Sequence, residues 1–385
     1  MRPSACLLAL ALVLPSTSVS AQHEPARQAT PRFRNGPATD TFPIGVWLQS
    51  PHNAERYRAI GIDLYVGLFG GPTKEQLQAL DAASMRVVCA QNDVGLAWPG
   101  KTIVGWMHGD EPDNAQGRRL RGYAPPIPPH DVVADYERLH KADPTRPILL
   151  NLGQGAAWDG WHGRGERTGH PEDYPEYCKG CDLVSFDIYP VTHSHPDVAG
   201  KLEFVGHGVT RLVGWTQGKK PVWACIETSH VNHAERRPTP EQVRSEVWLA
   251  IASGASGIVY FAHAFEPKFV EAGLLSHPEI EAAVKATNAE VRAATPALLA
   301  PRADAKVRTA TTGRIAVRVH ELDGQLHVFT ASLQGEPMHV RFAVSGRSHG
   351  KVVEVGAATS PRPLANGAFE VDFAAYGVRN FRIGD

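Results

Sequence analysis

The segment TIVGWMHGDEP, residues 102–112, is a short apolar run that ends directly before two carboxylates. A second segment, PVWACIETSH at residues 221–230, repeats this arrangement, and Glu227 closes its apolar run. Short apolar runs of this kind predict strands that are covered on both faces, as in a parallel sheet. Polar residues that directly follow such strands lie at one edge of the sheet, where α/β proteins bind their ligands.

Further apolar runs of the same length lie on both sides of these two, and segments with helical periodicity separate them. The predicted strands are residues 44–48, 63–68, 86–89, 103–108, 148–152, 183–187, 222–227 and 257–261. The predicted helices include residues 73–81, 131–141, 239–254 and 278–295. Eight strand–helix pairs over about 250 residues predict a (β/α)8 barrel, or TIM barrel, in residues 41–300. A doubly wound sheet is the alternative, but no GxGxxG sequence follows the first strand.

The pattern changes after Pro301, where apolar residues alternate with period two. Residues 314–321 and 325–330 show this alternation on both sides of Leu322-Asp323-Gly324, which predicts a hairpin. Three later segments are similar, at residues 338–344, 351–355 and 369–373. We therefore expect residues 305–385 to form a small antiparallel β-sandwich domain that packs against the barrel and takes no part in catalysis.

The N-terminus has the features of an export signal. Arg2 precedes an apolar run at residues 6–14, and small residues at 18–21 offer a cleavage site after Ala21. The run is too short to span a bilayer. We expect a signal peptide at residues 1–21, a flexible polar leader at 22–40, and a mature protein that is secreted or periplasmic and free of the membrane.

The charge of the chain argues against a nucleic acid partner. Charged residues make up 21% of the 385 residues, and the formal net charge is -1. There is neither a basic stripe nor an acidic tail, so a neutral or mixed substrate is favoured. The sequence leaves the oligomeric state open.

Cleavage of the signal would leave four cysteines, Cys89, Cys178, Cys181 and Cys225. In an oxidising compartment, Cys178 and Cys181 can form a small-loop disulfide. The alternative is a zinc site, which needs two more ligands, and His193 and His195 are close in sequence. The other two cysteines lie within apolar runs and are expected to be buried.

Polar residues are enriched just after the predicted strands, where a barrel builds its pocket. The predicted substrate-binding residues are Gln49, Asp93, Asp110, Asn151, Asp187, Tyr189, His230 and His263, together with the nearby Trp47. An alternative role for Asp187 is to act as a third catalytic carboxylate or to orient a neighbour. Aromatic faces beside carboxylates and amides suit sugar rings, which need a flat apolar surface and hydrogen bonds to hydroxyls. The set predicts a carbohydrate substrate.

Hydrolysis of a glycosidic bond needs a protonated carboxyl near the leaving oxygen and a second carboxylate near the anomeric carbon. In a retaining enzyme the two groups are about 5–5.5 Å apart, and strands four and seven of a barrel can bring them that close. We therefore predict Glu111 as the acid/base and Glu227 as the nucleophile. We expect neither a cofactor nor a metal.

These motifs resemble the clan of retaining (β/α)8 glycoside hydrolases that carry the acid/base after strand four and the nucleophile after strand seven. The stretches GWMHGDEP (105–112) and FDIYP (186–190) are similar to those of bacterial members with a C-terminal β-domain. The resemblance covers residues 42–295 and implies cleavage of a β-linked polysaccharide or oligosaccharide. It also implies that Tyr189 is the strand-six residue that touches the nucleophile.

The chain departs from the clan's pattern at two places. Asp110 stands where the clan usually has the asparagine that binds a sugar 2-hydroxyl, and Phe261 and His263 stand where a tryptophan commonly ends strand eight. Two other functions are therefore considered. One is a barrel that binds carbohydrate without hydrolysing it. The other is a metal-dependent hydrolase, which would need ligands such as HxH on strand one, where Val46-Trp47-Leu48 supplies none.

Overall fold

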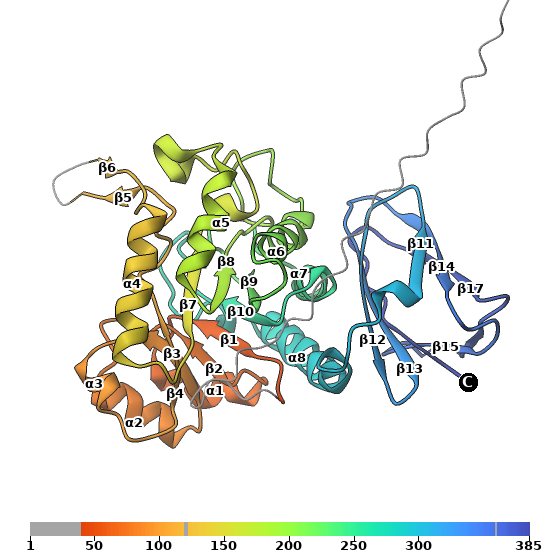
Figure 1. Cartoon of the computed structure of the whole chain (residues 1–385), viewed down its shortest axis with the longest axis horizontal. Helices are drawn as coiled ribbons and strands as arrows, with labels where there is room; N and C mark the ends of the chain where they lie inside the picture. The colour runs from red at the N-terminus through yellow and green to blue at the C-terminus, as the bar shows by residue number, and fades with distance from the viewer. Residues whose placement is uncertain (1–39, 119–121, 359) are drawn as a thin grey trace, which may run out of the picture.

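The computed structural model describes residues 40–118, 122–358 and 360–385. The predicted signal peptide and the predicted leader, apart from Asp40, lie outside these residues. The described chain forms a barrel followed by a separate β-domain (Figure 1).

Parallel strands close into a barrel with the order β1-β10-β9-β8-β7-β4-β3-β2. The strands are β1 (Ile44–Trp47), β2 (Leu64–Val66), β3 (Arg86–Ala90), β4 (Ile103–Met107), β7 (Ile148–Leu152), β8 (Leu183–Phe186), β9 (Val222–Glu227) and β10 (Gly257–Phe261). Each strand overlaps one of the predicted strands, with ends that differ by at most two residues. The prediction of a (β/α)8 barrel is confirmed.

Helices surround the barrel. They are α1 (Ala54–Ala59), α2 (Lys74–Ala82), α3 (Asp93–Leu96), α4 (Pro129–Ala142), α5 (Tyr174–Tyr177), α6 (Glu203–Trp215), α7 (Pro240–Ser253) and α8 (Pro278–Leu298). The four predicted helices correspond to α2, α4, α7 and α8. Thr73 and Thr239 begin α2 and α7 with capping boxes, in which each threonine side chain accepts a hydrogen bond from the backbone N–H three residues later.

Helix α6 had no counterpart among the predicted helices, and its glycines explain why. Gly206, Gly208 and Gly214 weaken the intrinsic preference of this segment for a helix. A Cβ atom on Gly208 would lie 2.2 Å from the ring of Phe186 on β8. The glycine therefore allows α6 to pack closely against the barrel, and this contact outweighs the poor local propensity.

Side chains of the barrel strands alternate between the interior and the surrounding helices. On β7, Leu149 packs in the interior, whereas Leu150 packs against the helices. On β9, Trp223 and Cys225 belong to the interior cluster. Polar residues replace the apolar ones toward the carboxyl ends of the strands, so the interior becomes hydrophilic at its mouth.

The C-terminal domain consists of two antiparallel sheets. One contains β11 (Val307–Ala310), β14 (Met338–Val344) and β17 (Ala368–Phe373), in the order β11-β14-β17. The other, in the order β12-β13-β18-β15-β16, contains β12 (Ile315–Leu322), β13 (Gln325–Ser332), β15 (Lys351–Glu354), β16 (Arg362–Pro363) and β18 (Phe381–Gly384). Asp323 and Gly324 both have positive φ in the predicted hairpin turn between β12 and β13. Apolar side chains from both sheets form a common core, which confirms the β-sandwich.

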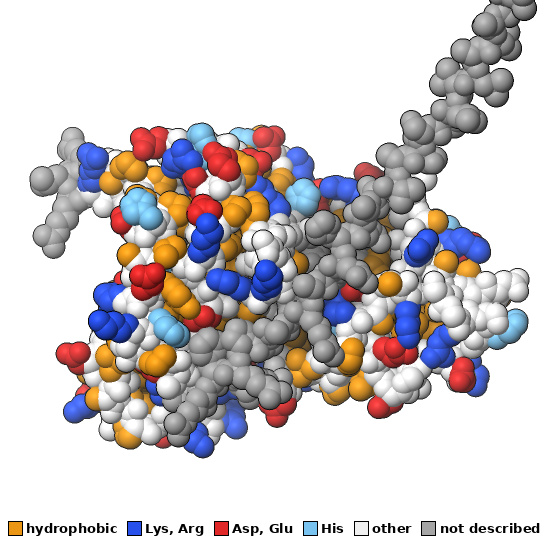
Figure 2. All heavy atoms as spheres, viewed as in Figure 1, with side chains coloured by type: hydrophobic (Ala, Val, Ile, Leu, Met, Phe, Trp, Pro, Cys, Tyr) orange, Lys and Arg blue, Asp and Glu red, His pale blue; other side chains and the backbone are white. Residues whose placement is uncertain are grey.

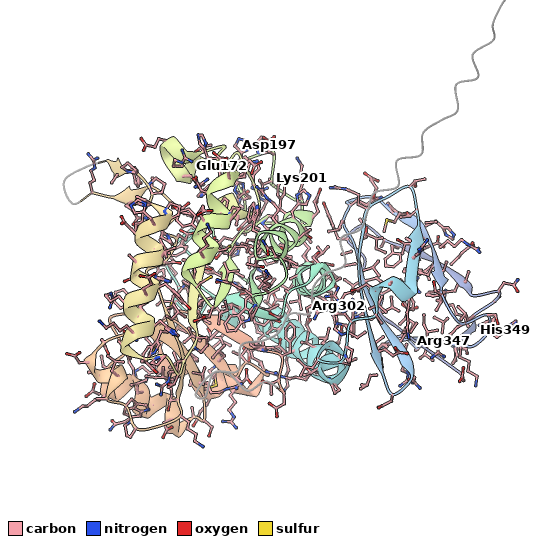
Figure 3. All side chains as sticks on the ribbon, in the orientation of Figure 1. Glu172, Asp197, Lys201, Arg302, Arg347 and His349 are labelled. Atoms are coloured by element: carbon pink, nitrogen blue, oxygen red, sulfur yellow. The ribbon has the colours of Figure 1, made fainter. Side chains whose placement is uncertain are left out.

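Strands β12 and β13 face helix α7 of the barrel, as Figure 1 shows. The rings of Trp248 on α7 and Phe329 on β13 stack with centroids 5.7 Å apart. Arg318 of β12 donates hydrogen bonds to the carbonyl oxygens of Ile251 and Ala255 at the end of α7. Arg302 lies at this junction in Figure 3. The β-domain is therefore built onto the barrel.

The surface in Figure 2 carries acidic and basic side chains in mixture, without a patch of one sign. Within the described ranges, no helix has both the length and the apolar character needed to cross a membrane.

Candidate active site

The backbone of Glu111 holds an unusual conformation just after β4. Its φ is +45°, a left-handed value that costs a residue with a Cβ atom about 1–2 kcal/mol. The N–H of Glu111 donates to the carbonyl oxygen of Asn151 at 3.2 Å, and the N–H of Asn114 donates to the carbonyl oxygen of Glu111 at 3.0 Å. These bonds hold the turn so that the half-buried Glu111 side chain lies at the barrel mouth.

The carboxyl group of Glu111 lies beside that of Asp187, which follows β8. The two groups lie close enough to share a proton, if one of them carries it. The Oε2 atom of Glu111 also accepts from Asn114 Nδ2 at 2.8 Å, and the Tyr189 hydroxyl donates to Asp187 Oδ2 at 3.0 Å. Among the described residues, Asp187 Oδ1 finds no N–H or O–H donor of its own. A proton on Glu111 would satisfy this oxygen.

The electrostatics of this pair favour retention of that proton. Burial raises the pKa of Glu111 well above its usual range, and the charges of Asp187 and Asp110 raise it further. Burial also raises the pKa of Asp187 to about 7, although hydrogen bonds from Glu111 and Tyr189 oppose the shift. Two carboxyl groups this close do not both ionise readily at neutral pH. Glu111 is thus a half-exposed carboxylic acid that can donate a proton.

Other predicted residues join the same network. Asp110 Oδ1 accepts from Asn151 Nδ2 at 2.9 Å, and Asn151 Oδ1 accepts from the Ser185 hydroxyl at 2.6 Å. The structure therefore brings Asp110, Glu111, Asn151, Asp187 and Tyr189 together at the ends of β4, β7 and β8.

Two residues of this site were not among the predicted ones, although both directly follow the GDEP turn. Asp113 is fully buried and accepts from Gly153 N and from the Tyr174 hydroxyl, each at 2.9 Å. Asn114 connects Glu111 to Trp161, whose indole N–H donates to Asn114 Oδ1 at 2.9 Å. The acidic and amide pair that directly follows the GDEP turn is the sequence signal that could have indicated them.

Glu227 has a different environment. Alternation along β9 would place its side chain on the inner face with Trp223 and Cys225. Its carboxylate instead accepts from Val191 N at 2.6 Å and from the backbone N–H and hydroxyl of Thr192, at 3.0 and 2.7 Å. The residue is 0% exposed. No hydrogen bond between described residues joins Glu227 to Glu111. The carboxyl group that lies beside Glu111 is that of Asp187.

The neighbour of Glu227 is Glu246, which α7 places behind β9. Glu246 is also 0% exposed, and neither of its carboxyl oxygens has an N–H or hydroxyl donor among the described residues. The two carboxyl groups lie close enough to share a proton. Burial and the charge of Glu227 raise the pKa of Glu246 well above its usual range, whereas burial raises the pKa of Glu227 to about 7. Glu246 therefore holds the shared proton, and Glu227 ionises first.

The remaining predicted residues lie outside the hydrogen-bond network of Glu111. The buried Gln49 accepts from the Tyr57 hydroxyl and donates to the carbonyl oxygen of Glu271. Trp47 packs inside the barrel. Asp93 is exposed at the first position of α3.

Two predicted histidines also have other contacts. His230 is half-buried, and its Nδ1 hydrogen-bonds with the carbonyl oxygen of His233. His263 is buried against the ring of Phe261, and burial lowers its pKa. The labelled Glu172, Asp197 and Lys201 in Figure 3 lie on the loops after β7 and β8, at the outer edge of the barrel.

The cysteines follow neither of the two alternatives considered from the sequence. Cys178 and Cys181 are buried free thiols, and Lys220 Nζ donates to both of their carbonyl oxygens. His193 Nε2 lies 2.9 Å from Gln154 Oε1. Among the described residues, no three His, Cys, Asp or Glu side chains gather as metal ligands would.

Residues 132–291 match the family model Glyco_hydro_42, whose description is beta-galactosidase. The match covers about two fifths of the chain and contains Asp187, Glu227 and Glu246, but it begins after Glu111. Over this part of the closed barrel, the chain is similar to a family of glycoside hydrolases. No curated protein sequence matches it.

Solved structures with a similar fold include glycosidases. AmyP bound to maltotriose has a TM-score of 0.50 at 11% identity, over 90% of this chain and 97% of that one. A GH30 endoxylanase from Clostridium papyrosolvens has a TM-score of 0.48 at 9% identity, over 92% and 98% of the two chains. A beta-galactosidase from Marinomonas has a TM-score of 0.47 at 15% identity, over 67% and 61%. At such identities, the similarity to these three structures concerns the fold alone.

Proposed function

We propose that the protein is an exported retaining glycosidase that cleaves β-linked polysaccharides or oligosaccharides by double displacement. Glu111 is the acid/base and Glu227 the nucleophile. The observation that carries the proposal is the half-exposed carboxyl of Glu111 at the mouth of a barrel, beside Asp187, where burial raises its pKa. A carboxylic acid that keeps its proton near neutral pH is what departure of a sugar oxygen requires.

The proposed reaction has two steps. In the first, Glu111 gives its proton to the glycosidic oxygen while a carboxylate attacks the anomeric carbon, so that the bond to the leaving sugar breaks and a glycosyl ester forms. In the second, the Glu111 carboxylate takes a proton from a water molecule, whose oxygen attacks the anomeric carbon and releases the enzyme carboxylate. Glu111 is again protonated at the end of the cycle.

The position of Glu227 at the carboxyl end of β9 supports its role as the attacking group. Three donors fix its carboxylate, and Glu246 holds the neighbouring proton, so Glu227 is the more easily ionised member of that pair. The role requires that a sugar reach this fully covered side chain. Asp187 is the rival nucleophile because its carboxyl contacts Glu111.

The test is hydrolysis of 4-nitrophenyl β-galactoside, β-glucoside, β-xyloside and β-mannoside and of the matching polysaccharides. Wild type is compared with Glu227→Gln, Asp187→Asn and, as a control, Glu241→Gln, which changes an exposed glutamate on α7. Loss of turnover in Glu227→Gln, with covalent labelling of Glu227 by a 2-fluoro glycoside, supports the proposal. Labelling of Asp187 would transfer the nucleophile to that residue, and wild type without activity would favour a carbohydrate-binding barrel.

Export is part of the proposal and rests on the charged and apolar pattern of residues 1–21. Expression of the full chain with its N-terminus in a bacterial host, followed by N-terminal sequencing of the periplasmic fraction, tests it. A mature chain that begins at Gln22 is expected, and an uncleaved chain in the cytoplasm would contradict export.

A further inference from the structure

The loop after β10 exposes two phenylalanine rings beside the barrel mouth. Phe265 is 49% exposed and Phe269 is 61% exposed, and their centroids are 5.7 Å apart. Ala264 and Val270 exchange backbone hydrogen bonds of 2.9 and 2.8 Å, which close the loop into a tight turn. The N–H of Phe265 also donates to the carbonyl oxygen of His230. The backbone therefore fixes both rings in solvent.

These rings form the outer end of an aromatic series that begins at the carboxyl pair. Tyr189, which donates to Asp187, has its ring centroid 4.8 Å from that of Phe261, and Phe261 is 6.2 Å from Phe265. The ring of His263 contacts two members of the series, with its centroid 5.3 Å from that of Phe261 and 5.7 Å from that of Phe269. Ring contacts thus run without a break from Asp187 to the surface.

Exposure of two phenyl rings is unfavourable in water, and the closed turn is too short to fold them inward. Sugar rings carry C–H faces that stack on aromatic side chains and hydroxyls that need polar partners. Glu266 and Lys268 are exposed in the same turn and supply a carboxylate and an ammonium group. The chemistry of the turn therefore matches a saccharide better than an apolar ligand.

We propose that Phe265 and Phe269 form a stacking platform that binds a sugar unit of the substrate next to the unit that is cleaved. The inference rests on the proposed function. The platform makes the protein selective for chains of sugars over single glycosides. A sugar chain bound on the platform would extend past Phe261 and Tyr189 toward Asp187 and Glu111.

Affinity gel electrophoresis tests the platform without a need for turnover. The full-length Glu111→Gln protein is run through gels that contain β-1,4-galactan, hydroxyethylcellulose, β-1,4-xylan or β-1,4-mannan. Retardation by at least one of them is expected, and Phe265→Ala and Phe269→Ala should each weaken it by about tenfold. Phe69→Ala is the control, because Phe69 is 85% exposed on the loop after β2 and no ring contact between described residues joins it to this series.

The outcomes separate the platform from the proposed reaction. Hydrolysis of 4-nitrophenyl glycosides by the two phenylalanine variants should match wild type, while KM for the retarding polysaccharide rises. Phe265→Trp should restore retardation, which excludes misfolding as the cause of a loss. The platform is wrong if no gel retards the protein, if both alanine variants migrate like their parent, or if Phe69→Ala has the larger effect. Absence of turnover with normal retardation would overturn the reaction alone.

Discussion

Glu111 combines a left-handed backbone with a carboxyl group that lies beside Asp187 and has a raised pKa. Glu111→Gln keeps the size of the side chain and removes the transferable proton. We expect kcat/KM to fall by about 10²–10⁴-fold on glycosides with poor leaving groups, and far less on 4-nitrophenyl glycosides, because a good leaving group needs little protonation. The pKa of Glu111 is raised, so the basic limb of the pH profile, where Glu111 loses its proton, should lie above the usual range of a glutamate. Equal losses on both substrate types would remove Glu111 from the acid role.

Tyr189 contacts Asp187, the second member of the carboxyl pair. Its hydroxyl donates to Asp187, which favours the ionised carboxylate and keeps the pKa of Asp187 as low as about 7. Tyr189→Phe removes the donor, so the pKa of Asp187 should rise and the acidic limb of the pH profile of kcat/KM should move to higher pH. Tyr136→Phe is the matched control, because it removes the same kind of hydrogen bond at another place: the Tyr136 hydroxyl donates to Asp182 Oδ1 at 2.9 Å. An acidic limb that stays in place, or that moves equally in both variants, would contradict this role.

At the scale of elements, β9 and α7 meet through the buried pair of Glu227 and Glu246. The pKa of Glu246 is raised above the value that the unfolded chain has, so the folded state binds more protons than the unfolded state. The free energy of unfolding should therefore fall as the pH rises from about 4.5 toward the folded-state pKa, by up to about 1.4 kcal/mol per pH unit for one proton. Glu246→Gln cannot ionise and should flatten this slope.

Urea unfolding between pH 5 and 8 measures that slope. Glu241→Gln serves as the control because it makes the same chemical change at an exposed position of the same helix. Its slope should match that of wild type. If Glu246→Gln keeps the wild-type slope as well, the two buried carboxyl groups do not share a proton.

The strands could be predicted from the sequence because burial on both faces produces continuous apolar runs, as at residues 222–227. The direction of the Glu227 side chain could not, because the donors that turn it toward the helices belong to Val191 and Thr192, which follow another strand. Glu246 was missed for a related reason. A glutamate on a helix normally faces solvent, and nothing local indicates that a buried carboxylate lies opposite it.

The same limit holds for the whole molecule. Period-two alternation predicted the β-domain, but not the junction that binds it to the barrel. There, Arg318 of β12 donates to the carbonyl oxygens of Ile251 and Ala255 at the end of α7 and, through Nε, to His320 Nε2 at 2.8 Å. The Ile251 carbonyl oxygen also accepts from Gly254 N, and Ala255 lies just beyond the helix, so a side chain from the second domain reinforces the end of α7. The helix that holds Glu246 is thus stabilised at one end by the β-domain.

His320 makes this junction sensitive to acid. Its Nδ1 lies 2.7 Å from the carbonyl oxygen of Ala300 and donates to it, while Nε2 accepts from Arg318, so the ring is neutral. Burial and the charge of Arg318 lower the pKa of His320 to about 3. The unfolded chain binds a proton on this residue below about pH 6.5, and the folded chain does not. The stability that His320 contributes is therefore complete above pH 6.5 and is lost as the pH falls toward 3.

His320→Gln tests this consequence because its amide can accept from Arg318 and donate to Ala300 without a change of charge. Between pH 6.5 and 4.5, the unfolded wild-type chain binds a proton on His320 that the folded chain does not bind. The free energy of unfolding of wild type should therefore fall with falling pH, relative to the variant, by about 1.4 kcal/mol per pH unit. The carboxyl pairs act in the opposite direction over part of this range, so the difference between the two proteins is the quantity to measure. Parallel urea-derived curves for wild type and variant would show that His320 does not couple the two domains to pH.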